Sequence, residues 1–279
     1  MSQEIMVSCR QIDPIVGEPE RNRALIVSEA HQAASEGAQV VVFPELAPCG
    51  YSFESAAEVE TVAEDADGDL IQEWAELSAD LGIVIIAGYA EKASDGKLFN
   101  SAALLDPNGA RANYRKTHLW GREPEYFSSG DKTPPVVQTS VGRIGVLVCY
   151  DLDFPEYVRE VALSGAQLLC APVNWPYFPY PDNALPTEMI RTQASAGVNR
   201  MAIAVCDRSG TDRSQAWLGG SQVVNSDGYS VTHPLIGTGG SVSAALNLSL
   251  SDVKSVGSYN HVFDDRRPEL YRAILETQR

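Results

Sequence analysis

The sequence predicts an α/β protein in which mixed β-sheets are covered by helices. Short runs rich in Val, Ile and Ala alternate with longer segments of helical periodicity. Some of the short runs are apolar throughout and others alternate, a mixture typical of strands buried under helices. The chain has 279 residues, of which 44% are hydrophobic, and this is enough for one large core. We find no repeat or linker, so residues 1–279 are predicted to form a single domain.

Helices and strands alternate in the first half of the chain. Gly82 can end a helix because glycine readily adopts the left-handed conformation that closes one. The sequence Pro-Asn-Gly at 107–109 is typical of a turn between two strands. In order, we expect a helix over 22–37, a strand over 39–44, a helix over 70–82, a strand over 83–90, and strands over 101–106 and 110–116.

The second half continues the alternation and adds two long loops. Pro155 suits the first turn of a helix and Gly165 its end. The loop 122–135 is rich in Pro, Gly and charge, and the loop 174–186 is aromatic; such loops often carry functional sites. We expect a strand over 142–150, a helix over 154–165, a strand over 166–172, a helix over 186–200, a strand over 201–207, and two more strands within 219–228 and 239–249.

Composition limits the possible partners. The chain carries 21 Lys and Arg against 37 Asp and Glu, a net charge of −16, which disfavours binding to nucleic acid or to an anionic membrane. No apolar run approaches the roughly 20 residues of a membrane span, and residues 1–14 lack the pattern of a signal peptide. The five cysteines are widely spaced, which argues against a disulfide framework or a zinc site. We therefore expect a cytoplasmic protein with reduced thiols and no metal or cofactor.

Three of the predicted strands end in reactive side chains, namely Glu45, Lys116 and Cys149. Ligands of open α/β sheets bind beyond the carboxyl ends of the strands. A carboxylate can take the proton of a thiol, and an ammonium can stabilise an oxyanion on an attacked carbon. Each residue alone could be an ordinary surface charge or core thiol. Cys9, Cys170 and Cys206 lie within apolar stretches and are interpreted as core thiols.

The segments around these residues carry a family resemblance. "VVFPEL", "YRKTHL" and "GVLVCYDLDFPE" resemble the three signature segments of the nitrilase superfamily, the carbon–nitrogen hydrolases, with 71 residues from Glu45 to Lys116 and 33 from Lys116 to Cys149. The resemblance extends from "QIDPIVGEPERN" to "GGSQVVNSDG". It implies an αββα sandwich that forms a four-layer αββα-αββα assembly on dimerisation, so a homodimer or higher homo-oligomer is expected.

The resemblance also implies roles for individual residues. Cys149 would be the nucleophile, Glu45 the general base, and Lys116 an oxyanion donor together with the backbone N–H of Tyr150. A further family glutamate that holds the lysine and positions substrate or water matches Glu123, with Glu125 as a poorer match.

Other polar residues near the signature segments have competing interpretations. His118 could form a Cys–His pair, but the family pattern treats it as structural. Asp151, Glu156 and Arg159 are expected to order the turn around the nucleophile, with an ion pair as a plausible form.

The segment "CYDLDFPE" resembles that of simple amidases rather than nitrilases or amino-acid carbamoylases. The predicted function is therefore hydrolysis of small aliphatic or aryl-alkyl amides through a thioester. Nitrile hydrolysis, N-carbamoyl hydrolysis and acyl transfer remain alternatives, and a non-enzymatic scaffold is disfavoured by the complete triad. An aromatic wall is expected from Trp120, Tyr150, Trp175, Tyr177, Phe178 and Tyr180, although 175–180 could equally form loop packing or a subunit contact; Asn174 and Tyr51 are further candidates for substrate binding.

Overall fold

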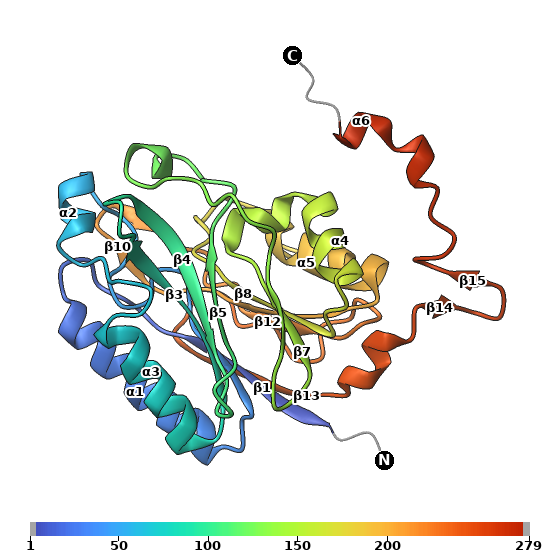
Figure 1. Cartoon of the computed structure of the whole chain (residues 1–279), viewed down its shortest axis with the longest axis horizontal. Helices are drawn as coiled ribbons and strands as arrows, with labels where there is room; N and C mark the ends of the chain where they lie inside the picture. Colours follow the sequence, from blue (N-terminus) through green and yellow to red (C-terminus); the bar gives the residue numbers. More distant parts are fainter. Residues whose placement is uncertain (1–3, 276–279) are drawn as a thin grey trace.

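Two β-sheets stack face to face between two layers of helices in the computed structural model, which describes residues 4–275. The helices α1 and α3 cover one sheet, and α4 and α5 cover the other (Figure 1). This is the αββα sandwich that the sequence predicts. Residues 1–3 and 276–279, which the single-domain prediction includes, lie outside the described residues.

The first sheet has six strands in the order β13-β1-β2-β3-β4-β5. The neighbours β1, β2 and β3 are parallel and the remaining pairs are antiparallel, so the sheet is mixed as predicted. Its strands are β1 (Ile5–Gln11), β2 (Val40–Val42), β3 (Val84–Lys92), β4 (Leu98–Leu105), β5 (Arg111–Arg115) and β13 (Gly240–Leu246).

The second sheet has five strands in the order β12-β9-β8-β7-β6. Here β7, β8 and β9 are parallel and the outer pairs are antiparallel. Its strands are β6 (Val136–Gln138), β7 (Arg143–Val146), β8 (Leu168–Pro172), β9 (Ala202–Cys206) and β12 (Gln222–Val224).

The long helices follow the sequence signals closely. The helix α3 buries Leu70, Trp74 and Leu77 on one face and ends at Gly82, whose φ of 67° is left-handed as expected. Pro155 opens α4, where its missing N–H costs no hydrogen bond. The helices are α1 (Pro19–Ser35), α2 (Ala56–Glu60), α3 (Asp69–Leu81), α4 (Pro155–Leu163), α5 (Thr187–Asn199) and α6 (Arg272–Leu275).

Short elements fill the loops and the C-terminal part of the chain. None of the helices within residues 4–275 combines the length and apolarity needed to cross a membrane. The short elements are the 3-10 turns η1 (Glu123–Glu125), η2 (Cys149–Asp153), η3 (Leu248–Asp252) and η4 (Pro268–Leu270), and the two-residue strands β10 (Thr211–Asp212), β11 (Gln215–Ala216), β14 (Ser255–Val256) and β15 (Asn260–His261).

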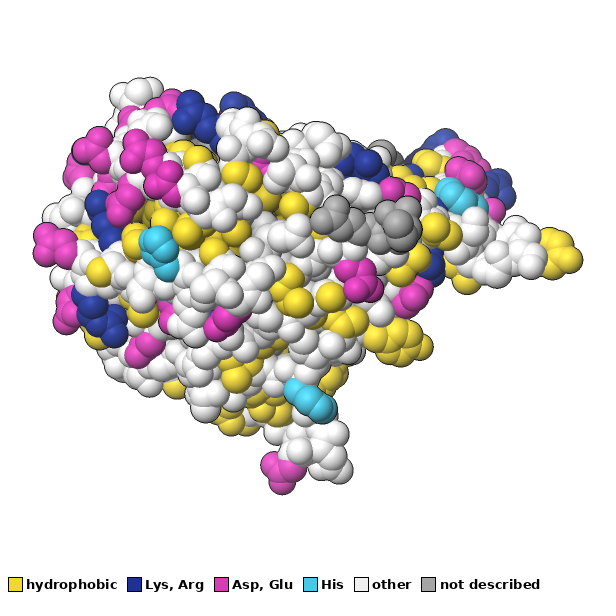
Figure 2. Space-filling model, turned by 90° about the horizontal axis from the view of Figure 1, so that it is seen from below, with side chains coloured by type: hydrophobic (Ala, Val, Ile, Leu, Met, Phe, Trp, Pro, Cys, Tyr) yellow, Lys and Arg dark blue, Asp and Glu magenta, His cyan; other side chains and the backbone are white. Residues whose placement is uncertain are grey.

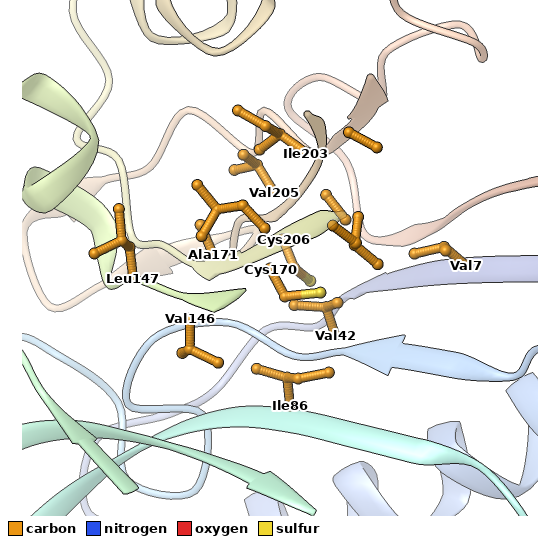
Figure 3. Close-up of a cluster of buried hydrophobic side chains, with 14 of the residues drawn as sticks. Val7, Val42, Ile86, Val146, Leu147, Cys170, Ala171, Ile203, Val205 and Cys206 are labelled. Atoms are coloured by element: carbon orange, nitrogen blue, oxygen red, sulfur yellow. The ribbon is translucent and has the colours of Figure 1, made fainter. Parts of the chain in front are cut away.

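Apolar side chains from both sheets meet in the centre of the sandwich. Figure 3 shows Val42 and Ile86 of the first sheet facing Val146 and Cys170 of the second. Cys9, Cys170 and Cys206 are all 0% exposed, so their prediction as core thiols is confirmed. Burial on both faces explains why these strands are apolar throughout rather than alternating.

The predicted strand 142–150 is too long, because β7 ends at Val146. Cys149 has a φ of 49°, a left-handed conformation that a strand cannot contain, and it begins the turn η2. The seven-residue strand β1 and the three-residue strand β6 were not predicted. The nucleophile candidate therefore lies in a tight turn beyond the strand rather than on the strand itself.

Candidate active site

Glu45, Lys116 and Glu123 form one buried cluster. Lys116 Nζ donates to Glu45 Oε1 and to Glu123 Oε1, each at 2.7 Å. The side chains of Glu45 and Lys116 are fully buried, and that of Glu123 is 3% exposed. Two carboxylates thus share one ammonium, a costly arrangement that requires close pairing in a dry site.

The close approach of two strands places Glu45. The residue follows β2, and the backbone N–H of Gly88 on β3 donates to Pro44 O at 3.1 Å. A Cβ at Gly88 would lie 2.6 Å from Glu45 Cα and 2.7 Å from Leu46 N. Only glycine leaves room for this part of the backbone, because neither contact atom is a movable side-chain end.

The strands β4 and β5 place Lys116. The backbone N–H of Lys116 donates to Asn100 O at 2.8 Å, which continues the pairing of the two strands. Asn100 Nδ2 also donates to Glu45 Oε1 at 2.7 Å and to Glu123 Oε1 at 3.1 Å. One asparagine on β4 therefore fixes both carboxylates that surround the ammonium.

Cys149 is connected to this cluster through Asn174. The Cys149 thiol donates to Asn174 O at 3.8 Å, and Asn174 Nδ2 donates to Glu45 O at 2.8 Å. The turn that holds Cys149 is fixed by Asp151, whose buried carboxylate accepts hydrogen bonds from Val148 N and Tyr114 Oη at 3.2 and 2.7 Å. A carboxylate in this position supports the left-handed backbone of Cys149.

The second carboxylate oxygen of Glu45 is free to accept a proton. Oε1 accepts from Lys116 and Asn100, whereas Oε2 is buried and has no hydrogen-bond partner within the described part of the chain. A buried acceptor without a partner is costly and calls for a functional explanation.

The electrostatics of the cluster favour neutral forms of Glu45 and Cys149. Burial raises the pKa of Glu45 to about 7, against the lowering effect of Lys116. Burial and then Glu45 raise the pKa of Cys149 well above its usual value, and Lys116 lowers it only in part. Burial lowers the pKa of Lys116, but Glu123 and Glu45 outweigh this effect and raise it overall. The lysine stays charged and the resting thiol keeps its proton, so the thiol needs a base.

Glu123 and not Glu125 belongs to the cluster. Glu123 Oε1 also accepts from Tyr51 Oη, and its Oε2 accepts from the backbone N–H of Trp120 at 2.8 Å. Glu125 instead pairs with Arg122 on the surface. The preference for Glu123 in the sequence thus agrees with its place in the structure.

A narrow pocket leads to Cys149, and a larger one lies beside it. Trp120 and Pro176 line both pockets. The narrow pocket has a volume of about 40 Å³ and is lined by Trp120, Cys149, Tyr150, Asp153, Trp175, Pro176, Phe178, Glu188 and Arg191. The larger has about 350 Å³, and Tyr51, Glu123, Tyr126 and Trp217 are among its walls.

The predicted aromatic wall is present only in part. Trp120, Tyr150, Trp175 and Phe178 line the narrow pocket, but Tyr177 and Tyr180 do not. Those two rings contact each other with centroids 6.4 Å apart. The sequence overestimated the wall because it could not show which way the rings of an irregular loop turn.

Known proteins are similar to this chain in sequence and in fold. A family model described as carbon–nitrogen hydrolase matches residues 6–251. A protein named nitrilase from Pyrococcus abyssi is 33% identical over 96% of this chain and 99% of its own length. The chain belongs to the carbon–nitrogen hydrolases of the nitrilase superfamily.

Amidases are among the similar proteins. An N-carbamoylputrescine amidase from Solanum lycopersicum is 32% identical over 90% of this chain and 87% of its own length. The crystal structure of an amidase from Nesterenkonia sp. superimposes with a TM-score of 0.80 at 26% identity, covering 98% of this chain and 97% of that one. The αββα fold prediction is thereby confirmed.

Asp151, Glu156 and Arg159 were predicted to order the turn η2, which contains Cys149, and the structure confirms this only for Asp151. Asp151 takes part as expected, and it also accepts from His118 Nδ1 at 2.8 Å, while the His118 ring stacks on Phe154. Arg159 does not: its Nη2 donates to Val198 O, and neither it nor Glu156 forms an ion pair in the part of the chain that the structure describes. The expected ion pair is wrong: Glu156 and Arg159 line the hollow beside the C-terminal segment instead.

Several residues that hold the carbon–nitrogen hydrolase site in place were missed. The buried carboxylate of Asp207 accepts from the backbone N–H groups of Trp175, Arg208 and Gly220 at 3.1, 2.8 and 2.8 Å. Asp212, paired with Arg208, accepts from the backbone N–H of Tyr51. The polar run that follows β9 could have indicated them by the same strand-end argument that found Glu45 and Cys149.

Proposed function

We propose that this carbon–nitrogen hydrolase is an amidase that converts small amides to carboxylic acids and ammonia through a thioester on Cys149. The observation that carries the proposal is the free Oε2 of Glu45 in a cluster with Lys116, beside a protonated thiol. A base with an open lone pair, a fixed cation and a nucleophile are the three groups that acyl transfer requires.

In the first half-reaction Glu45 takes the Cys149 proton as the sulfur attacks the amide carbon. The oxyanion that forms is stabilised by Lys116 Nζ and by the backbone N–H of Tyr150. The C–N bond then breaks, the nitrogen leaves as ammonia with the proton held by Glu45, and the acyl group remains on sulfur. Glu123 holds Lys116 in place through the hydrogen bond at 2.7 Å.

Water completes the cycle in the second half-reaction. Glu45, again unprotonated, takes a proton from water, and the hydroxide oxygen attacks the thioester carbon. The C–S bond breaks, the carboxylic acid leaves, and the sulfur regains the proton from Glu45. The same base therefore serves both halves, as expected when one carboxylate faces one reacting carbon.

The solved amidase structures of similar fold support an amide as the substrate, whereas the relative from Pyrococcus abyssi is named a nitrilase. The Nesterenkonia amidase is described in complex with butyramide in a mutant form, and with the acetamide moiety of fluoroacetamide attached to its active site cysteine in another. The segment "CYDLDFPE" in this chain also resembles amidases. The aromatic walls of the narrow pocket at Cys149 suit an aliphatic acyl group.

Ammonia release from matched amides, nitriles and N-carbamoyl amines tests this function. We expect butyramide to be hydrolysed faster than butyronitrile, and hydroxylamine to divert part of the acyl group to a hydroxamate. Faster turnover of the nitrile would contradict the amidase assignment. If the carboxylic acid forms only in the absence of hydroxylamine or another amine that can accept the acyl group, the enzyme is an acyltransferase and not a hydrolase.

We also propose that two copies associate through the C-terminal arm, residues 253–275. The arm leaves the body of the molecule and carries β14, β15 and α6 (Figure 1), and hydrophobic side chains cover the tip of the projection in Figure 2. Tyr259 is 95% exposed, and Leu270 and Ile274 are also exposed. A hollow of about 430 Å³ between the arm and the helices α4 and α5 offers further apolar surface.

Light scattering of the full chain tests this association. We expect at least a dimer, and a shift toward monomer when Leu270 and Ile274 are both replaced by Asp. A monomeric wild-type chain at micromolar concentration would contradict the proposal.

A further inference from the structure

Three charged side chains line the pocket of Cys149 and have no part in the proposed chemistry. Asp153 ends the turn η2, and Glu188 and Arg191 lie in the first turns of α5. Figure 1 shows α5 beside α4 on the outer face of the second sheet, and its amino-terminal end follows the aromatic loop 174–186. Cys149 and these charged side chains thus line one narrow cavity.

The charges in this group do not balance. Arg191 Nη1 donates to Asp153 Oδ1 at 2.7 Å, and both side chains are half-buried. Glu188 is also half-buried, and among residues 4–275 its carboxylate has neither an ion-pair partner nor a hydrogen-bond donor. Two carboxylates and one guanidinium leave one negative charge facing the pocket.

The negative charge of Glu188 affects the pKa of a neighbouring carboxylate, that of Asp153. Burial raises the pKa of Asp153, Arg191 lowers it and the negative charge of Glu188 raises it further. Arg191 therefore does not cancel both carboxylates. A positive charge placed between them would be attracted more strongly than it would be in water, because the pocket walls exclude solvent.

The remaining walls suit a short hydrocarbon chain. Tyr150, Trp175 and Phe178 line the cavity together with Cys149 and Glu188. Aromatic faces accept methylene groups and also attract a cation that lies against them. A substrate with an acyl carbon at Cys149 and an ammonium at Glu188 would satisfy both ends of the pocket.

We propose that Glu188 selects ω-amino amides, in which a short aliphatic chain joins the scissile amide to a cationic amine. This inference rests on the proposed amidase function and specifies its substrate class. A substrate with a terminal carboxylate would be repelled by Glu188, and Arg191 is already bound to Asp153. A neutral chain would bury the Glu188 carboxylate without a partner, which is unfavourable.

Three amides of similar length test the selection: δ-aminovaleramide, hexanamide and glutaramate, which end in an ammonium, a methyl group and a carboxylate. We expect wild-type kcat/KM to be at least about tenfold higher for δ-aminovaleramide than for hexanamide, and lowest for glutaramate. Glu188→Gln should lose most of this preference, through a higher KM for δ-aminovaleramide and a kcat/KM for hexanamide that is equal to or above that of the wild type. Glu188→Lys should favour glutaramate.

Glu156→Gln is the matched control. Glu156 lies in the first turn of α4, as Glu188 does in α5, but it faces the hollow beside the C-terminal arm instead of the Cys149 pocket. We expect this variant to keep the wild-type preference. Equal kcat/KM for hexanamide and δ-aminovaleramide in the wild type would overturn the inference and leave the amidase function standing.

A binding measurement separates failure of the selection from failure of the amidase function. Pentylamine carries the ammonium without an amide, so it should protect Cys149 from iodoacetamide in the wild type and in Glu156→Gln, but not in Glu188→Gln. Protection in that pattern supports the site even if no amide is hydrolysed. Absence of protection in the wild type would overturn the inference whatever the turnover.

Discussion

Cys149 and Cys170 are both buried, yet their surroundings have opposite chemistry. Cys170 lies on β8 among aliphatic side chains between the two sheets (Figure 3), and burial, followed by the effect of Cys9, raises its pKa well above the usual value. Cys149 has a raised pKa as well, but Glu45 and Lys116 act on it electrostatically. A low resting pKa therefore does not distinguish the proposed nucleophile from the core thiol. What differs is that Cys149 has the Glu45 carboxylate near it and lines a pocket.

The largest expected effect comes from removing the reactive thiol. Cys149→Ala should abolish turnover, because no other group in the pocket can form the thioester, and the fold should persist since the side chain is small. Ammonia release and thermal unfolding measure the two parts. A Cys149→Ala protein that releases ammonia at a rate near wild type would remove the distinction between the two cysteines.

Lys116 should have the next largest effect on catalysis. Lys116→Ala is expected to lower kcat about 100- to 1000-fold by removing an oxyanion donor, and to slow alkylation of Cys149 by iodoacetamide. Lys116→Arg should rescue little because the planar guanidinium has a different shape.

Two further variants control for other consequences of losing Lys116. Lys116→Met keeps most of the side-chain volume, so it separates a catalytic loss from a failure to fold. Lys97→Ala removes an exposed lysine paired with Asp95 and should have no effect. If the turnover of Lys116→Met stayed within a few-fold of wild type, the ammonium of Lys116 would have no catalytic role.

The reactivity of Cys149 should depend on the protonation of Glu45. The pKa of Glu45 is raised from 4.5 to about 7, so alkylation should slow as the pH falls below about 7 and Glu45 becomes protonated. The raised pKa also means that the stabilising contribution of Glu45 is present at pH below 4.5 and is lost as the pH rises through about 7.

Asn100→Ala tests the origin of this pH dependence. The substitution removes a hydrogen bond that lowers the pKa of Glu45, so that pKa should rise. The acid limb of the pH profile, in which the rate of Cys149 alkylation falls as Glu45 becomes protonated, should therefore move to higher pH. Asn113→Ala, which removes a hydrogen bond to Glu91 on the same sheet, is the control and should leave the limb in place. An unchanged limb in both variants would mean that Glu45 is not the base.

The smallest catalytic effect is expected at the core cysteine. Cys170→Ala should destabilise the protein by about 1–3 kcal/mol through lost packing between the sheets. Its kcat should remain within about twofold of wild type, because Cys170 makes no hydrogen bond to a residue of the site in the described structure. A large loss of kcat with unchanged stability would contradict the view of this region as inert core.

The strand-end argument selected Glu45, Lys116 and Cys149, which follow strands of two different sheets, and their catalytic roles stay predictions. The structure places Glu45 and Lys116 in one buried cluster and connects Cys149 to it through Asn174, although the predicted strand before Cys149 extends too far. The sequence could not show that Asp207 binds three backbone N–H groups, because these contacts join segments distant along the chain. It also could not show that Glu188 faces Cys149, since helical periodicity fixes a face of α5 and not the cavity beyond it.

The contact between Gly88 and Glu45 has a consequence for engineering this protein. Replacing a glycine within a strand by alanine usually gains about 0.5–1 kcal/mol, since the unfolded chain loses freedom. At position 88 the added methyl group would lie 2.6 Å from Glu45 Cα and would displace the proposed base. Variant libraries designed to raise thermal stability should therefore leave Gly88 unchanged. A substitution at this position would lower the catalytic activity by moving Glu45, even if it raised the melting temperature.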